Sequence, residues 1–329
     1  MLKKPIFKSL VLIATIILFT SCKEEKKPTV DTIEKTERRP HIVFVTGDEE
    51  YRSEESMPML ASIAKRELNA KVTVCYALDS LGIIDPNRID HISNLEALEN
   101  ADLMVIFTRF RQLPKKERDY IANYVESGKP IVGFRTATHA FNYEDPSLAY
   151  WNNEWPTKVF GQQWITHHGH FDDGKFPVTQ ITKIDSSSVI LNGFKPFEAY
   201  SWLYHVDGGD WKLYGDSKPI LQGHSLKSQH QMDGNLDKFP LTNPVAWTKS
   251  YTAESGGKSR VFFTTLGHPY DFKIPEVRKI AMNGIFWALG KEKGIPDNGV
   301  NVELNTPYEP NNSGFGEKYK RNRKPQPIL

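Results

Sequence analysis

A short apolar run that turns polar at its end does most to restrict the fold of this chain. Ile131-Val132-Gly133-Phe134 is entered through Pro130 and is followed at once by Arg135, Thr136 and, slightly further on, His139. Such a run is typical of a buried strand in a parallel sheet. Open α/β sheets bind ligands just beyond the carboxyl ends of such strands. The sequence therefore predicts an α/β fold with a candidate site here, because Arg binds anionic or hydroxyl oxygens and His transfers protons or binds metals.

Similar runs elsewhere extend this prediction to a whole sheet. Further strands are expected at 41–46, 72–76, 103–107 and 260–266, and helices at 57–68, 114–125 and 274–289. Strands that alternate with helices favour βαβ units, a mainly parallel sheet and helices on both of its faces. The middle of the chain, roughly 142–250, is rich in aromatic residues, Gly and Pro. We expect it to form loops and short strands over the carboxyl edge of the sheet.

The N-terminus has the features of a lipoprotein signal peptide. Residues 1–22 contain early lysines, an apolar run too short for a comfortable membrane span, and Leu18-Phe19-Thr20-Ser21-Cys22, which resembles a bacterial lipobox. The resemblance implies that Cys22 is lipidated and anchors the protein in the cell envelope, on the outer membrane, facing the periplasm or the surface. The alternative is an ordinary secretory signal. Residues 23–39 predict a flexible tether, 40–292 the folded domain, and 293–329 a polar tail that is either disordered or wrapped on the surface.

Charge and cysteine content exclude some classes of protein. The chain has 42 Lys and Arg against 40 Asp and Glu, and three of the lysines lie in the first 21 residues, which contain no acidic residue. The remainder has 39 basic against 40 acidic residues, so no nucleic-acid partner is expected. One of the two cysteines is Cys22, and the other, Cys75, lies in a strand-like run and is expected in the core. No disulfide framework is predicted.

Histidines gather where strand-like runs end. Six of the ten histidines lie in such segments: His139, His167, His168, His170, His205 and His268. Two interpretations are open. In the first, a divalent metal such as zinc is bound, with His167, His168 and His170 as the candidate ligands. In the second, the site works by acid–base chemistry. Its candidate catalytic residues are Arg135, His139, His168 and His268, and its candidate substrate-binding residues are Thr136, His170, Tyr204, His205 and Asp271. No GxGxxG, GxxxxGK[ST] or GxSxG motif is present.

Several segments in this order resemble the ThuA-like (trehalose utilisation) family. They are 43–47, 132–141, Phe160-Gly161 with the following His-Gly-His, 243–247 and 260–268. The resemblance implies a flavodoxin-like fold related to class I glutamine amidotransferases, and a role in carbohydrate metabolism. The chain departs from the family pattern at Arg135 and His139, where many members have His and Asp. It also has Leu241-Thr242-Asn243 before Pro244, where many members have Asp-His.

The resulting hypothesis is a carbohydrate-processing enzyme that acts on a disaccharide or its keto form by histidine acid–base chemistry. Its expected partners are a small-molecule carbohydrate and, through the N-terminal lipid, a membrane. A sugar-binding lipoprotein without turnover is one alternative, and a metal-dependent sugar hydrolase or isomerase is another. A third is a remnant of an amidotransferase-like fold that serves protein contacts.

The lipobox leads to a test of the anchor. Replacing Cys22 by Ser removes the thiol that would carry the lipid, so Cys22→Ser is expected to move the protein from the membrane fraction to the soluble fraction. Immunoblotting of fractionated cells measures this, with Cys75→Ser as the matched control that stays with the membrane. A Cys22→Ser protein that still sediments with membranes would contradict the lipoprotein interpretation.

Overall fold

The centre of the structure is a set of five parallel strands. The computed structural model describes residues 38–207 and 212–329, so Cys22 and the signal segment lie outside the described residues. The strands are β1 (His41–Gly47), β2 (Lys71–Cys75), β3 (Leu103–Thr108), β4 (Ile131–Phe134) and β11 (Lys258–Thr264). They lie side by side in the order β2-β1-β3-β4-β11, and every neighbouring pair is parallel. This arrangement confirms the prediction of an α/β fold.

The middle of the chain differs from the prediction. Four of its strands extend the same sheet beyond β11, in antiparallel pairings. These are β10 (Thr242–Thr252), β9 (Lys218–Ser225), β6 (Thr179–Lys183) and β7 (Phe197–Ala199). Only β5 (Gln163–His167) and β8 (Tyr204–Asp207) form a separate pair within the described residues. The sequence does not predict this extension of the sheet, because Pro244 and a shift in register interrupt the pairing of β10 with β9. The strand nevertheless continues on both sides of the interruption.

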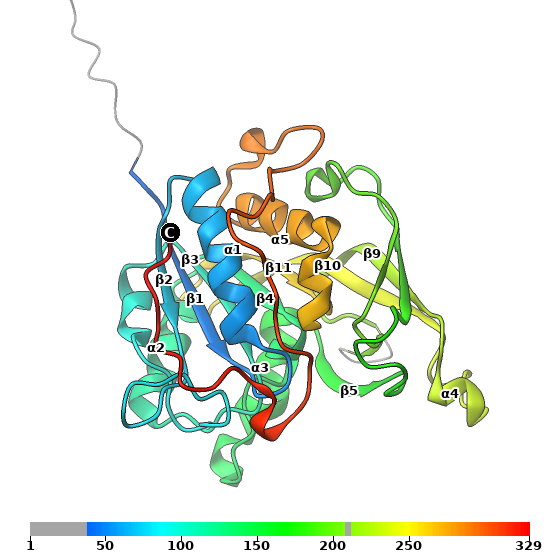
Figure 1. Ribbon diagram of the computed structural model, residues 1–329, viewed down its shortest axis with the longest axis horizontal. Helices are drawn as coiled ribbons and strands as arrows, with labels where there is room; N and C mark the ends of the chain where they lie inside the picture. The colour runs from blue at the N-terminus through cyan, green and yellow to red at the C-terminus, as the bar shows by residue number, and fades with distance from the viewer. Residues whose placement is uncertain (1–37, 208–211) are drawn as a thin grey trace, which may run out of the picture. The chain divides into compact units, whose positions relative to one another are not determined.

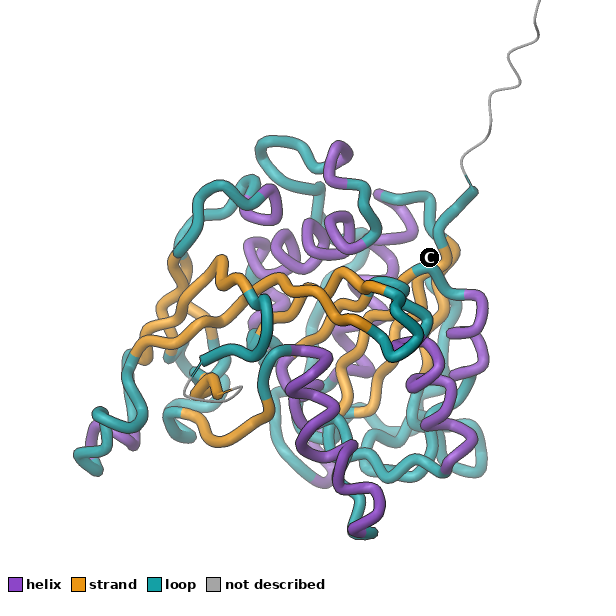
Figure 2. The backbone as a smooth tube through the Cα atoms, turned by 180° about the vertical axis from the view of Figure 1, so that it is seen from behind, coloured by secondary structure: helices purple, strands orange, loops and turns teal. Residues whose placement is uncertain are grey.

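Helices cover both faces of the sheet (Figures 1 and 2). On one face lie α1 (Ser53–Glu67) and α5 (Pro275–Ala288), and on the other lie α2 (Lys115–Glu126) and α3 (Ala149–Phe160), while α4 (Gln229–Met232) is a short turn near the end of β9. Successive residues of a strand point to opposite faces. Phe44 of β1 therefore joins the core under α1 and α5, while Val45 joins the core under α2 and α3. No described helix is long and apolar enough to cross a membrane.

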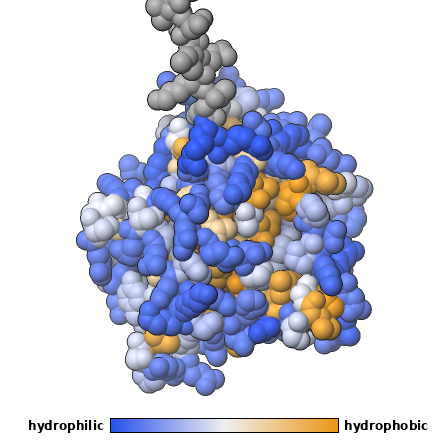
Figure 3. All heavy atoms as spheres, turned by 90° about the vertical axis from the view of Figure 1, so that its left-hand side faces the viewer, coloured by the Kyte–Doolittle hydropathy of each residue, from blue (hydrophilic) through white to orange (hydrophobic). Residues whose placement is uncertain are grey.

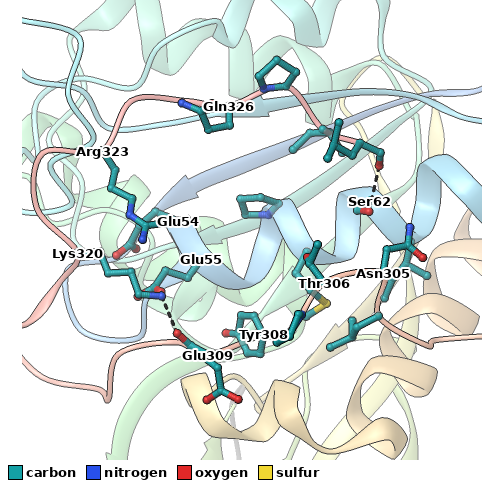
Figure 4. A pocket seen from close by; sticks show the side chains of 18 of the residues that line it. Glu54, Glu55, Ser62, Asn305, Thr306, Tyr308, Glu309, Lys320, Arg323 and Gln326 are labelled. Atoms are coloured by element: carbon teal, nitrogen blue, oxygen red, sulfur yellow. Dashed lines mark hydrogen bonds and ion pairs between the residues drawn. The ribbon is translucent and has the colours of Figure 1, made fainter.

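The C-terminal tail lies along α1 (Figure 1). The Lys65 ammonium donates to the carbonyl of Ile328 at 2.6 Å, and the amide of Ile84 donates to the carbonyl of Arg323 at 2.8 Å. Between α1 and the tail is a cavity of about 400 Å³ (Figure 4). The face shown in Figure 3 is mostly hydrophilic, with hydrophobic residues in small groups, as expected where charged helices and a polar tail cover an apolar core.

Glu54 lies in the first turn of α1, on the wall of this cavity. Among the described residues, neither of its carboxyl oxygens has a hydrogen-bond partner, and the Arg52 Nε is 3.8 Å away. Burial raises the pKa of Glu54 to about 8, against the opposing effect of Arg52. In the unfolded chain this carboxyl ionises near pH 4.5. Between these two values the folded state keeps a proton that the unfolded state has lost, so stability falls as the pH rises through this window.

Glu54→Gln removes this titration. The variant is expected to match the wild type near pH 4.5 and to exceed its unfolding free energy at pH 8 by a few kcal/mol, on the order of 1.4 kcal/mol for each pKa unit of the shift. Urea unfolding at the two pH values measures the difference. Glu67→Gln, at the other end of α1, is the matched control. An equal loss of stability with pH in the wild type and in Glu54→Gln would show that the carboxyl is not held in its neutral form.

Candidate functional site

The candidate site lies at the carboxyl ends of the parallel strands. From β1 the chain passes first to β2 on one side and later to β3 on the other, so the order of the strands reverses beside β1. Open α/β sheets bind their ligands in the crevice at such a reversal. The segments that follow β1, β3, β4 and β11 carry Asp48, Arg109, Arg135 and His268 respectively. The parallel arrangement brings all four segments to one edge.

Arg135 lies fully buried at the centre of this edge. It opens the 3₁₀ helix η2 (Arg135–His139), and its guanidinium carbon lies 4.3 Å from the ring centre of Tyr51 and 4.4 Å from that of Tyr204. Its Nη1 donates to the carbonyl of Thr265 at 2.9 Å, and its Nη2 donates to the hydroxyl of Tyr51 at 3.1 Å. The guanidinium is therefore held between two aromatic rings, where cation–π attraction and hydrogen bonds offset its desolvation.

A glycine makes room for this arrangement. A side chain at Gly267 would place its Cβ 2.9 Å from the Cβ of Arg135 and 3.0 Å from the ring of Phe107. Arg135 itself has a φ of 38°, in the left-handed region that residues other than glycine adopt at a cost. The backbone after β4 is thus turned to aim the arginine inward rather than toward solvent.

Thr136 is used within the protein. Its hydroxyl donates to Asp48, which is fully buried. The other carboxylate oxygen of Asp48 accepts the amides of Glu50 and Tyr51 at 2.7 Å each. Thr136, a candidate substrate-binding residue, therefore fixes the loop that carries Tyr51.

His139 lies next to Tyr204, with 6.2 Å between the ring centres, and beside Trp164 at 5.3 Å. Its Nδ1 is 3.2 Å from the hydroxyl of Thr138, which donates its own proton to the carbonyl of Arg135. This assigns the ring proton to Nδ1 and leaves Nε2, which has no partner among the described residues, as an acceptor. Burial, and then the charges of Arg109 and Arg135, hold the pKa of His139 well below its ordinary value.

His167 and His170 lie over Trp202. The ring of His167 stacks on Trp202 with 5.3 Å between centres, and His170 meets His167 edge-on at 4.5 Å. The Nδ1 of His167 accepts the amide of Gly169 at 3.1 Å, which leaves Nε2–H as a donor. Burial and the neighbouring His170 lower the pKa of His167 to about 3. His170 is exposed.

His168 and His205 lie on the other side of the β5–β8 pair, because neighbouring residues of a strand point to opposite faces. The ring of His168 is 5.3 Å from His230, and its Nδ1 is 2.7 Å from the hydroxyl of Ser228. His205 packs edge-on against Phe239 with 5.0 Å between centres. The structure therefore does not bring these two histidines together with Arg135 and His139.

His268 and Asp271 lie at the edge but face inward, and both are fully buried. The Nδ1 of His268 accepts the amide of Tyr270 and its Nε2 donates to Asp173, each at 3.1 Å. Asp271 accepts backbone amides on both carboxylate oxygens, including that of Tyr200 at 2.7 Å. Both side chains thus hold the loop after β11 in shape, and His268 reaches the cluster through Tyr51, 6.4 Å away between ring centres.

A group of charged side chains lies at the same edge of the sheet, formed by Glu49, Glu50, Arg109 and Arg111. Arg109 forms ion pairs with Glu49 and with Glu50, the latter at 3.1 Å, and Arg111 also pairs with Glu49. Burial raises the pKa of Glu50 to about 7, Arg109 opposes this shift and Asp48 adds to it. A buried carboxyl that titrates near neutral pH is a frequent feature of catalytic sites.

Comparison with known proteins defines the family. Residues 41–288 match the family model named ThuA, described as trehalose utilisation. The chain belongs to this family. Two ThuA-like proteins of known structure are similar, each with a TM-score of 0.49. The one from Bacteroides uniformis is 14% identical and the match covers 79% of this chain and 95% of that protein. The one from Parabacteroides merdae is 15% identical, with 87% and 100% covered. A search of curated proteins gave no match. The family description indicates a carbohydrate-related role.

Within this ThuA domain, two groups of residues were not anticipated from the sequence. Glu49, Glu50 and Tyr51 follow β1 directly, and Arg109 and Arg111 follow β3. The rule that singled out Arg135, polar residues just past a buried strand, applies equally to them. They are not histidines, and the predicted chemistry of the site rested on histidines.

The metal interpretation has no support from side-chain positions. Among the described residues, no group of three or more His, Cys, Asp or Glu side chains is arranged to hold a metal ion. The candidate ligands are divided, because His168 points to the opposite side of β5 from the pair His167 and His170.

The lowered pKa values of His139 and His167 in this ThuA protein are open to direct measurement. Both rings are expected to be uncharged at pH 6, where a histidine of the unfolded chain is mostly protonated. The unfolded state binds protons on these two rings that the folded state does not bind. The free energy of unfolding is therefore expected to fall as the pH drops below about 6.5. Nitrogen NMR of labelled histidines measures the charge, with His139→Gln and His167→Gln assigning the signals. Midpoints between pH 6 and 7 for these two rings would contradict the expectation.

Proposed function

We propose that this protein is a carbohydrate-processing enzyme that acts on a disaccharide or keto-sugar by histidine acid–base chemistry. The observation that carries the proposal is the pair of neutral imidazoles that both lie next to Tyr204. His139 presents an acceptor at Nε2, and His167 presents a donor at Nε2. One group that takes a proton and one that gives a hydrogen bond are what proton transfer at a sugar hydroxyl or carbonyl requires.

Aromatic side chains supply surfaces for the sugar. Trp164 is 37% exposed beside His139, and the exposed His170 lies against Trp202. Flat aromatic faces bind the apolar faces of sugar rings, and polar groups around them select the hydroxyls. A disaccharide fits this division because it presents two rings and many hydroxyls.

Arg135 acts through the tyrosines. The Tyr51 hydroxyl accepts a hydrogen bond from Arg135, and its own hydrogen bond to Glu50 opposes the rise that burial causes in the pKa of that carboxyl. To donate to a substrate oxygen, Tyr51 would exchange Glu50 for that oxygen. The Tyr204 hydroxyl has no hydrogen-bond partner among the described residues, and burial raises its pKa well above the ordinary value, so it stays protonated. Two phenol donors next to a fixed positive charge would stabilise an oxygen that gains negative charge in the transition state. That negative charge would also raise the low proton affinity of His139 when a proton is transferred.

The fold and location are proposed in the same way. The order β2-β1-β3-β4-β11 corresponds to the 2-1-3-4-5 order of flavodoxin-like sheets, which supports a flavodoxin-like core related to class I glutamine amidotransferases. The lipobox-like segment supports a lipid anchor at Cys22 that holds the enzyme in the cell envelope.

Turnover tests the proposal. Purified protein is expected to convert at least one member of a panel of native and keto-disaccharides, and His139→Gln is expected to lower kcat by about 10²-fold. Thermal unfolding checks that the fold is unchanged, and His224→Gln, at an exposed histidine on β9, is the matched control. Binding of a sugar without any product would favour the non-catalytic sugar-binding protein instead.

A further inference from the structure

We propose that residues 311–315 of the C-terminal tail are part of the site, with Ser313 as a positioning residue for Asp173 and His268 and with Phe315 as the cover of Arg109. The tail lies outside residues 41–288, which match the family, so the family assigns it no role. The proposal extends the proposed function, because it adds a segment to the site at which the sugar would bind.

Ser313 fixes the acid that holds His268. It is 1% exposed, and its hydroxyl donates to Asp173 Oδ1 at 2.6 Å. Asn312 donates to the backbone carbonyl of Asp173 at 3.2 Å. The same Oδ1 accepts the Nε2 proton of His268 at 3.1 Å. The loop that carries Asp173 is thus tied to the sheet edge through the tail.

This chain of contacts leads to the centre of the site. His268 stacks on Tyr200 with 5.6 Å between ring centres and meets Tyr51 edge-on at 6.4 Å. Tyr51 in turn accepts the hydrogen bond of Arg135. A shift of Asp173 would therefore displace His268 and, through it, the phenol that we expect to contact the sugar.

Phe315 acts on the charged group. The guanidinium carbon of Arg109 lies between two rings, 4.3 Å from the centre of Phe110 and 5.1 Å from that of Phe315. Phe315 is 53% exposed, so only the face over Arg109 is covered. Backbone hydrogen bonds hold it there, because the amide of Gly314 donates to the carbonyl of Glu50 at 2.9 Å and Arg52 donates to the carbonyl of Gly314 at 2.8 Å. The tail is thereby joined to the loop after β1.

Residues 311–315, at the site, and the last residues of the tail are held by different contacts. The tail also borders the cavity over α1, and Tyr308 and Glu54 line this cavity (Figure 4). The last residues are attached through other contacts, such as the hydroxyl of Ser62 donating to the carbonyl of Leu329 at 3.1 Å. A substitution at Ser62 therefore loosens the tail without touching residues 311–315, which provides a matched control.

The test uses the full-length protein with Ser313→Ala, Ser313→Thr and the control Ser62→Ala. The first readout needs no sugar. The pKa of Asp173 is lowered overall: burial is the largest single effect and raises it, but the hydrogen bonds from His268 and Ser313, with the charges of His268 and Lys318, together outweigh burial. Carbon NMR titration of the Asp173 carboxyl is expected to show a higher pKa in Ser313→Ala, and a value near that of the wild type in Ser313→Thr and Ser62→Ala. An unchanged titration in Ser313→Ala would overturn the positioning role.

The second readout is activity on the sugar that the disaccharide panel identifies. Ser313→Ala and Phe315→Ala are expected to lower kcat/KM by about 10-fold with melting temperatures close to that of the wild type, and Ser313→Thr is expected to restore most of the loss. Losses of the same size in Ser62→Ala, or losses that follow the melting temperature, would show that the tail only stabilises the fold. If no sugar is converted by the wild type, the proposed function fails, and the Asp173 titration still decides the role of Ser313.

Discussion

The arrangement of the site depends on one buried positive charge. Arg135 has no exposed surface, and removing a guanidinium from water is costly unless it is fully engaged. The structure offsets most of this cost with carbonyls from Trp202 and Thr265, the hydroxyl of Tyr51, and the faces of Tyr51 and Tyr204, although the buried Nε has no hydrogen-bond partner among the described residues. These partners come from three separate parts of the chain, and Arg135 itself belongs to a fourth. The charge therefore fixes the relative positions of the loops after β1, β4 and β11 and of the β5–β8 pair.

The sequence was sufficient for the parallel half of the sheet because burial on both faces leaves a clear signal. Runs such as Val43-Phe44-Val45 have no polar member, and each is followed by polar residues at the same edge. The same rule located Arg135 and His139. It did not reveal that Arg135 would turn inward, because that depends on the space left by Gly267 and on a left-handed φ, which depend on the packed structure.

The candidate site was less predictable where contacts join distant segments. His167 and His168 are neighbours in sequence, and only the pairing of β5 with β8 decides which of them faces Tyr204. The pairing of His268 with Asp173 joins residues 95 positions apart, and it was invisible to any local pattern. The tail shows the limit most clearly. Its polar, Pro-rich sequence has no periodic apolar face, yet Ser313 is almost completely buried because the site supplies partners for its hydroxyl.

The attachment of the tail also bears on the order of events during synthesis. Arg52 contacts Gly314 across 262 positions of sequence, and Arg135 contacts Thr265 across 130. Contacts between such distant positions form late, because the chain between them must first be made and its loop-closure entropy overcome. The parallel strands β1 to β4 can be completed while the last third of the chain is still being translated. The site cannot be completed at that stage, since its final contacts come from residues such as Ser313 in the tail. A nascent or truncated chain would therefore contain most of the sheet and an incomplete site, so proteolytic loss of the last residues would affect activity before it affects the fold.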